Sequence, residues 1–360
     1  MSDNTSLDSV RERIDQLDVQ IQDLIVQRAA CAIQIADLKG REANTVYYRP
    51  EREAQVLRRV MARNCGDLET KAMARIFREM MAACLAIEQP LSVAFLGPEG
   101  TYTQEAARKH FGQASNMIPV TNIENVFHEV ESERVHYGVV AVENSTEGSV
   151  TLTLDMFLDS PLKICGEVAL RIRHCLLSHH EALSDIKMVY GHQQALSQCR
   201  NWLNTHLHDV EQIAVRSNAE AARIAAETVG AAAIAGERAA EVYQHNILER
   251  SIEDNSNNTT RFLILSSAFP PASGVDKTSL LVTTGNQPGT LHKVLSPFVK
   301  HKVSMTRIES RPSRRGTWDY VFFIDIEGHI EDANVAAAVQ ALEKTSVMVK
   351  LLGSYPNSVL

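Results

Sequence analysis

The stretch GVVAVENSTEGSV, residues 138–150, joins an apolar segment to a polar loop. Residues 138–142 form a short apolar run, which predicts a buried strand. Seven polar or glycine residues follow before a helical pattern begins at Val150. Turns between strands and helices are polar because their backbone needs partners, but ligands also bind at the carboxyl ends of strands in α/β sheets. The stretch alone favours neither explanation, and the rest of the chain has to decide.

The composition is that of an ordinary soluble protein. The chain has 360 residues, of which 44% are hydrophobic and 22% charged, which indicates two or three globular domains. The net charge of −8 argues against sequence-independent nucleic-acid binding. Six scattered cysteines without a CxxC pair indicate reduced thiols, and no signal peptide or membrane-length apolar run is visible. We expect a cytoplasmic protein with no nucleic-acid or membrane partner.

Three segments follow different patterns. The first is helical throughout, and the second alternates short apolar strands with amphipathic helices. Pro90 marks the first boundary, and the stretch SSAFPPASGVDK, residues 266–277, resembles a linker. The predicted domains are residues 1–90, 91–271 and 276–355.

The first helix carries one apolar seam with a charged gap. Apolar residues recur at spacings of three and four from Leu7 to Leu38, and Arg28 fills the one missing position. Lys39 lies 11 residues further, about 20° round the helix and about 16 Å along it, so the two cations could grip a small dianion. Arg11 lies about 25 Å from Arg28 along the helix, so if it serves the same ligand we expect it to come from a second chain. The alternative is a set of solvated charges on a coiled coil.

A second irregularity lies in the helix predicted near residues 70–88. Its apolar stripe of Phe77, Met81 and Cys84 continues to Glu88. A buried carboxyl tends to be held neutral and can then donate a hydrogen bond. Equally, Glu88 could lie in water at the frayed helix end.

These residues resemble the helical chorismate mutase family. The family pattern of an early Arg, a later Arg and Lys, an Arg-Glu loop and a late polar group is supplied by Arg11, Arg28, Lys39, Arg52, Glu53 and Glu88. Arg49 and Cys84 depart from the enterobacterial form, which has Asp and Ser there, and they would line the substrate site.

The resemblance implies a rearrangement of chorismate to prephenate without covalent catalysis. Arg11 and Arg28 would hold the two substrate carboxylates, while Glu53 would accept the substrate hydroxyl. Lys39 and a protonated Glu88 would donate to the breaking ether oxygen. Catalysis would come from holding the reactive conformer and stabilising the developing charge.

Several predicted strands of the middle segment end in polar residues. The four stretches are GPEGTYT at 97–103, ENSTEGSV at 143–150, GHQQALSQC at 191–199 and TRF at 260–262. Several such ends in one segment predict a site between two α/β lobes. The first stretch alone is a weak signal, because many turns look alike.

Together the four stretches resemble the prephenate dehydratase family. The resemblance implies a two-lobed, periplasmic-binding-protein-like fold, in which Thr260 donates or relays the proton for the departing hydroxyl. Substrate would be bound by Thr101, Glu143, Asn144, Ser145 and Gln198. Gly191 departs from the Ser often seen in its loop. Glu220 is a further candidate, although an acid at a helix N-terminus needs no other reason.

A histidine-rich stretch, RHCLLSHHEALSD at 173–185, invites a metal interpretation. It lacks regular ligand spacing and a second cluster. We expect its histidines to flank a strand and its turn, and we expect neither a metal nor another cofactor.

The third segment predicts the order β-α-β-β-α-β, which is a ferredoxin-like α+β arrangement. With GTLHKVL and ESRP it resembles an ACT regulatory domain, although Thr290 replaces a common Ala. The implied effector residues are Gly289, Leu291, Glu309, Ser310, Arg311 and Pro312. The alternative is a purely structural dimerisation domain.

The resemblances span nearly the whole chain. They imply that a homo-oligomer, at least a dimer, converts chorismate to prephenate and then to phenylpyruvate, with feedback inhibition by phenylalanine. The rival hypothesis is an amino-acid sensor that uses the two-lobed segment for binding only. The mutase-like residues Arg28, Lys39 and Glu88 argue against that rival.

Overall fold

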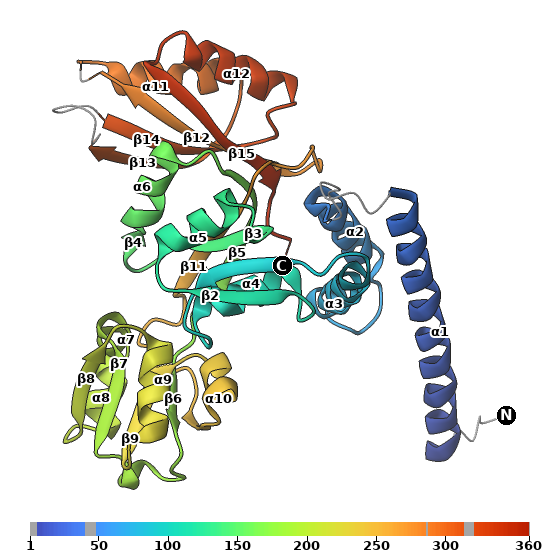
Figure 1. The fold of residues 1–360 in the computed structure, drawn as a ribbon, viewed down its shortest axis with the longest axis vertical. Coiled ribbons are helices and arrows are strands. Elements are labelled where there is room, and N and C mark those ends of the chain that lie inside the picture. Colours follow the sequence, from blue (N-terminus) through green and yellow to red (C-terminus); the bar gives the residue numbers. More distant parts are fainter. Residues whose placement is uncertain (1–5, 40–47, 286, 313–319, 360) are drawn as a thin grey trace.

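The computed structural model describes residues 6–39, 48–285, 287–312 and 320–359. Figure 1 shows an N-terminal group of helices, two α/β lobes and a C-terminal α/β layer. The expected multidomain architecture is therefore confirmed. No helix of the described residues is both long and apolar enough to cross a membrane.

The N-terminal segment contains the helices α1 (Leu7–Lys39), α2 (Pro50–Arg63) and α3 (Thr70–Glu88). Proline suits the first turn of α2, because the amide hydrogen that it lacks has no helical partner there. α2 buries Ala54, Leu57 and Val60 and packs against α3. α1 also contacts α3, but its buried residues Ala32 and Ala36 lie in its second half. The rest of α1 extends away from the molecule (Figure 1).

The first lobe of the middle segment is built on one six-stranded sheet. Its strands run in the order β2-β1-β3-β11-β5, with the short β4 paired to β3. They are β1 (Ser92–Leu96), β2 (Asn116–Val120), β3 (Tyr137–Asn144), β4 (Gly148–Ser149), β5 (Lys163–Arg171) and β11 (Thr259–Ser266). The helices of this lobe are α4 (Tyr102–Phe111), α5 (Ile123–Glu131) and α6 (Thr151–Asp159).

The second lobe is a five-stranded sheet of order β10-β6-β9-β7-β8. Its strands are β6 (Cys175–Ser178), β7 (Met188–His192), β8 (Glu211–Val215), β9 (Ala231–Ala235) and β10 (Asn246–Glu249). Its helices are α7 (Gln193–Gln198), α8 (Arg200–His206), α9 (Asn218–Glu227) and α10 (Glu237–Tyr243), with a short 3₁₀ turn at Leu183–Asp185. The chain enters this lobe after β5 and returns to the first lobe at β11, so two connections join the lobes.

The C-terminal segment has the predicted β-α-β-β-α-β order. Its elements are β12 (Asp276–Thr284), α11 (Thr290–Lys300), β13 (Met305–Pro312), β14 (Tyr320–Glu327), α12 (Ala333–Glu343) and β15 (Met348–Pro356). The strands form an antiparallel sheet of order β13-β14-β12-β15. One face of this sheet shares an apolar core with α11 and α12, which includes Val294, Phe298 and Leu342.

The other face of that sheet packs on the first lobe. Leu281, Phe323 and Tyr355 of the C-terminal sheet share a core with Ile164 and Leu263 of the lobe. β15 approaches β5 so closely that a Cβ atom at position 353 would lie 2.1 Å from the carbonyl oxygen of Ile164. Only Gly353 permits this contact, because a larger residue would force the two backbones apart.

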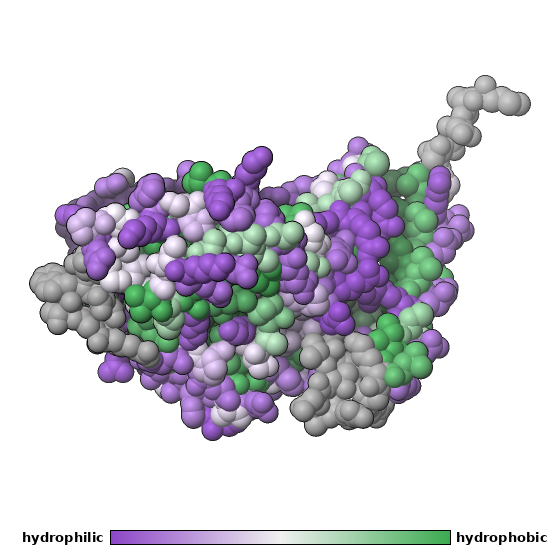
Figure 2. Space-filling view, turned by 90° about the horizontal axis from the view of Figure 1, so that it is seen from above, coloured by the Kyte–Doolittle hydropathy of each residue, from purple (hydrophilic) through white to green (hydrophobic). Residues whose placement is uncertain are grey.

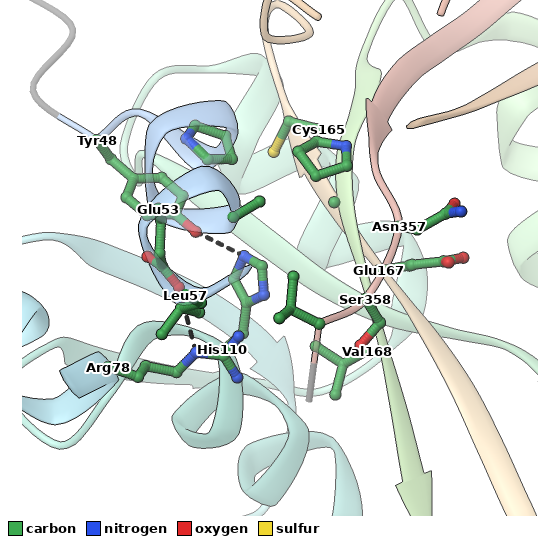
Figure 3. A pocket seen from close by; sticks show the side chains of 15 residues that line it. Tyr48, Glu53, Leu57, Arg78, His110, Cys165, Glu167, Val168, Asn357 and Ser358 are labelled. Carbon is green, nitrogen blue, oxygen red and sulfur yellow. Dashed lines mark hydrogen bonds and ion pairs between the residues drawn. The ribbon is translucent and has the colours of Figure 1, made fainter. Parts of the chain in front are cut away.

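The N-terminal helices pack on the flank of the first lobe, and α2 also contacts β15 of the C-terminal sheet (Figure 1). Tyr48, which precedes α2, is buried in a core with Phe111 and Tyr137 of the lobe. Its hydroxyl lies 2.9 Å from Nε2 of His110 on α4 and forms a hydrogen bond with it (Figure 3). Burial and, to a lesser extent, the charge of the nearby Arg78 lower the pKa of His110 to about 3. The ring is therefore neutral at pH 7.

The His110 contact predicts a pH dependence of stability. The unfolded chain gains a proton at His110 below about pH 6.5, but the folded chain does not until about pH 3. Stability that is fully present above pH 6.5 is therefore lost as the pH falls towards 3. We expect the melting temperature of His110→Gln to fall less than that of the wild type between pH 7 and pH 4.5. Glutamine still offers Tyr48 a hydrogen-bond partner but cannot titrate. Calorimetry of both proteins measures this, with the exposed His206→Gln as the control that should follow the wild type. Parallel pH curves for His110→Gln and the wild type would contradict the prediction.

Candidate active sites and effector site

The first candidate site is a cavity of about 320 Å³ between the N-terminal helices and the first lobe. It gathers several residues expected at the mutase site, and its lining includes Arg28, Arg49, Arg52, Glu53 and Glu88. Three guanidinium groups from two helices and the turn before α2 thus face one cavity. Such a cavity suits a small substrate with more than one carboxylate, because each guanidinium can bind a carboxylate through two hydrogen bonds.

Two expected mutase residues, Arg11 and Cys84, do not line this cavity, and the side chain of a third, Lys39, is not described. Arg11 is exposed on α1 and pairs with Asp8 at 3.5 Å. Cys84 is buried in α3 and does not line the cavity. Lys39 is the last residue of α1, and its side chain lies outside the described part of the chain.

Glu53 is held by a residue that the sequence did not single out. Arg78 of α3 donates from Nε to a Glu53 carboxylate oxygen at 3.2 Å, and from another nitrogen to the backbone oxygen of Lys109 on α4. Burial raises the pKa of Glu53, and the charge and hydrogen bond of Arg78 act against that rise. Figure 3 shows Glu53 and Arg78 directed towards one another beside His110. Arg78 thereby connects the mutase site to the first lobe.

The second candidate site is a hydrogen-bond network between the two lobes. Asn144, at the end of β3, donates to Thr260 Oγ1 at 2.8 Å and to Asn258 Oδ1 at 2.9 Å. Asn258 donates in turn to Gln198 Oε1 of the second lobe at 3.0 Å. His174 lies 2.9 Å from the same oxygen. The structure therefore brings together three expected residues, Asn144, Gln198 and Thr260, and joins them through Asn258 and His174.

His174 lies between two hydrogen-bond partners. The Gln198 oxygen can only accept, so His174 donates to it from Nε2. Nδ1 of the neutral ring lies 2.8 Å from the Tyr102 hydroxyl, whose single proton is shared between this nitrogen and the backbone oxygen of Arg173. Burial lowers the pKa of His174, which favours this neutral form, while Gln198 and Glu253 act in the opposite direction. His174 belongs to the histidine-rich stretch, and its partners here are protein groups. His180 likewise accepts from the amide of Gly230.

Other expected dehydratase residues serve local structure or face elsewhere. The Thr101 hydroxyl caps α4 and donates to the oxygen of Leu96, and Ser145 Oγ accepts from the amide of Thr259. Glu220 stabilises the start of α9: its amide donates to the N-cap Ser217 Oγ, and its carboxylate accepts from the amide of Arg216, the residue before the N-cap. Glu143 pairs at 3.1 Å with Arg307 of the C-terminal segment.

The expected effector residues lie on two faces of the C-terminal sheet. Gly289 and Leu291 line a pocket of about 230 Å³ at the start of α11, together with Tyr320 and Phe322. Gly289 has φ +82°, a conformation that favours glycine. On the edge strand β13, Ser310 and Pro312 lie opposite Phe322 and Tyr320.

Glu309 and Arg311 alternate with those residues and face the first lobe. Arg311 forms an ion pair with Asp155 of α6 at 3.3 Å. Only part of the ESRP stretch therefore lies beside the pocket in this chain. The motif combines residues on the pocket face with residues on an interdomain face.

Comparisons with known proteins assign all three segments. Residues 10–89 match the family described as chorismate mutase type II, residues 93–269 match prephenate dehydratase, and residues 278–344 match the ACT domain. A solved prephenate dehydratase from Arthrobacter aurescens, in complex with L-Phe, is 35% identical with a TM-score of 0.69. It covers 74% of this chain and 90% of its own.

Two curated relatives are similar over the whole chain. They are the bifunctional chorismate mutase/prephenate dehydratases of Pseudomonas aeruginosa, at 48% identity, and of Stutzerimonas stutzeri, at 49%. Each alignment covers 100% of this chain and 100% of the relative. The chain therefore belongs to the family of bifunctional chorismate mutase/prephenate dehydratases.

Proposed function

We propose that the cavity between α1, α2 and α3 is the chorismate site and that Arg28 and Arg52 bind the substrate carboxylates there. The observation that supports this is the convergence of their guanidinium groups with Arg49 on one cavity. The rearrangement breaks a carbon–oxygen bond and forms a carbon–carbon bond within one molecule, so no proton has to move. Lys39 and Glu88, the latter in its protonated form, donate to the ether oxygen as its charge grows. Glu53, held by Arg78, accepts the substrate hydroxyl.

We propose that prephenate binds at the network between the lobes, where Thr260 supplies the proton for the departing hydroxyl. Asn144 donates to Thr260 Oγ1, so the threonine is free to direct its own proton towards substrate. The hydroxyl leaves as water while the carboxylate leaves as carbon dioxide, and the ring becomes aromatic. Gln198 orients the substrate from the second lobe, and the Asn144–Asn258–Gln198 chain holds both lobes around it.

Thr260→Ala tests this assignment. We expect a loss of dehydratase turnover of about 10²–10⁴-fold, typical of losing a positioned proton donor, with mutase turnover near that of the wild type. Ultraviolet absorbance of chorismate and phenylpyruvate measures the two reactions separately. The neighbouring Thr259→Ala is the matched control and should keep both. An equal loss of both activities in Thr260→Ala would point to misfolding or a shared site and would overturn the assignment.

We propose that the working protein is a dimer formed along α1. The apolar seam of this helix is exposed in the single chain, with Leu24 at 63% and Ile14 at 51% exposure, and Figure 2 shows apolar atoms along it. A long apolar stripe on one helix is typical of a surface that another helix covers. A second chain would also bring Arg11 to a site that its own chain does not place it in.

Subunit complementation tests the shared site. Arg11→Ala and Arg28→Ala should each abolish most mutase activity when expressed alone. If Arg11 comes from the partner, mixed dimers of the two variants contain one intact site, and about half of the wild-type activity per mixed dimer should return. Mixing Arg11→Ala with itself under the same conditions is the control. Mixed dimers that stay inactive would show that both arginines serve the site of their own chain.

We propose that phenylalanine is the feedback effector and that it binds beside Gly289. The A. aurescens relative was solved in complex with L-Phe, and the pocket of this chain is lined by Tyr320 and Phe322, which suit an aromatic side chain. The six free cysteines agree with a reducing cytoplasm as the place where the enzyme acts.

Gly289→Val tests the effector site. Valine would fill the pocket and strain a backbone at positive φ, so we expect phenylalanine binding to fall by at least about tenfold. Isothermal titration calorimetry measures it. Gly66→Val, at a glycine with open space around it in the N-terminal segment, is the control. If Gly289→Val still binds phenylalanine with full affinity and is still inhibited, the effector acts elsewhere, most simply in the dehydratase site as a product-like competitor.

A further inference from the structure

The two strands that carry the dehydratase network present alternate residues to different parts of the molecule. In the antiparallel pair of β3 and β11, Thr260 lies opposite Asn144, and Arg261 lies opposite Glu143. Residues directly opposite one another point to the same face of a sheet, and their chain neighbours point to the other face. The Thr260–Asn144 pair joins the network between the lobes. The Arg261–Glu143 pair therefore faces away from it, towards the ACT domain.

Arg261 is enclosed by groups from both domains. Its guanidinium contacts Glu167 of β5 at 2.8 Å, Asp325 of β14 at 2.5 Å and the Tyr355 hydroxyl of β15 at 3.0 Å. Asp325 also accepts from Ser279 at 2.6 Å. Burial alone would raise the pKa of Asp325, but Arg261 and the Ser279 hydrogen bond lower it below its ordinary value. Asp325 is thus a fixed anion of the ACT domain, directly behind the strand that carries Thr260.

Arg307 of β13 makes the second link. It contacts Glu143 at 3.1 Å and donates to Ser149 Oγ of β4 at 2.7 Å, so it holds both ends of the ENSTEGS loop. The same guanidinium lies 3.9 Å from Glu309 of the ESRP stretch. Glu143 immediately precedes Asn144, whose side-chain oxygen accepts from the amides of Thr146 and Glu147 in that loop. Arg307 therefore connects an expected effector residue to the loop that orients Asn144.

We propose that Asp325 and Arg307 of the ACT domain are positioning residues for the dehydratase reaction. Asp325 acts through Arg261 on the position of Thr260, and Arg307 acts through Glu143 on the position of Asn144. This inference rests on the proposed function, because it gives the route by which phenylalanine at the ACT domain reaches the dehydratase site. An effector that changes how the ACT domain packs on the first lobe moves Asp325 and Arg307. These residues then move Arg261 and Glu143, which are the chain neighbours of Thr260 and Asn144.

The test uses the full chain with Asp325→Asn and Arg307→Gln, which remove one charge each and keep a polar side chain. The matched control is Lys350→Gln. Lys350 also reaches from the ACT sheet to the first lobe, but it contacts the backbone oxygens of Phe157 and Ser160 at the C-terminal end of α6. Arg307→Lys restores a cation opposite Glu143 and serves as the conservative rescue. Four measurements apply to every variant: mutase turnover, dehydratase kcat and KM, phenylalanine inhibition, and hydrogen exchange of the amides of residues 145–147.

We expect both charge-removing variants to lower dehydratase kcat by about 2- to 30-fold, the usual range for residues that couple two sites, with a smaller change in KM and unchanged mutase turnover. The ratio of dehydratase activity without and with saturating phenylalanine should shrink. The amides of Thr146 and Glu147 should exchange faster, because their acceptor on Asn144 is less firmly held. Arg307→Lys should recover part of each effect, and Lys350→Gln should resemble the wild type.

The double variant Arg307→Gln with Glu143→Gln separates positioning from direct substrate binding by Glu143. If Glu143 acts through Arg307, the two losses in kcat are not additive. Unchanged exchange at residues 145–147 together with unchanged kcat in both single variants would overturn the inference. So would an effect in Lys350→Gln as large as theirs, since that would be general loosening of the interface. A wild-type protein without dehydratase activity would overturn the proposed function. The hydrogen exchange of residues 145–147 would still show whether Asp325 and Arg307 position the loop.

Discussion

The buried guanidinium of Arg261 is the interaction on which the relation of the dehydratase and ACT domains depends. A buried charge is tolerated only when anions and hydrogen-bond acceptors surround it, and here they come from β5 of the dehydratase domain and from β14 and β15 of the ACT domain. Removing one partner of such a pair typically costs about 3–5 kcal/mol, because the other charge stays buried. The cation therefore fixes where the ACT sheet lies. The shared core around Leu263 and Tyr355, and the contact at Gly353, supply the apolar and steric parts of the same docking.

The mutase domain is attached by a different kind of contact. Tyr48 enters the core of the first lobe, and the proposed chorismate cavity is lined on one side by Leu91 and Phe111, which lie beyond the boundary predicted at Pro90. The mutase and dehydratase domains thus share a wall of this cavity, although the sequence divides cleanly between them. Arg78 reinforces this wall, since it holds Glu53 with one nitrogen and the oxygen of Lys109 with another. In contrast, most of α1 meets no other part of its own chain and is available to a second copy.

Sequence patterns predicted the helices and strands well, but they predicted poorly which residues contact one another across the fold. The apolar periodicity of residues 7–38 predicted α1, and the polar strand ends predicted where Asn144, Gln198 and Thr260 would meet. The family resemblance also indicated two enzymatic activities, and the assignment of the chain to that family sets the sensor hypothesis aside. The sequence could not reveal Arg78, Asn258, Asp325 or Arg307, because their roles come from partners 25 to 158 positions away. The resemblance placed all four residues of the ESRP stretch at the effector site. In the structure, strand alternation directs Glu309 and Arg311 to the face opposite that of Ser310 and Pro312. A strand in this segment implies side chains that alternate between two faces, but the sequence does not say which domain each face contacts.

That alternation explains how regulation and chemistry can share two short motifs. In a strand, neighbouring side chains point to opposite faces, so a residue that binds substrate has beside it a residue that can sense the domain behind the sheet. In the proposed mechanism, Thr260 and Arg261 divide these tasks on β11, and Asn144 and Glu143 divide them on β3. Because the two pairs lie opposite one another, the proposed coupling acts on both partners of one hydrogen bond rather than on a single side chain. An effector shifts such an arrangement only if it binds one position of the ACT domain on the lobe better than another. By reciprocity, substrate that stabilises the Thr260–Asn144 pair must then alter effector affinity by the same factor. The coupling is therefore a property of the sheet itself, and it needs no long chain of intermediates between the ACT domain and the reacting substrate.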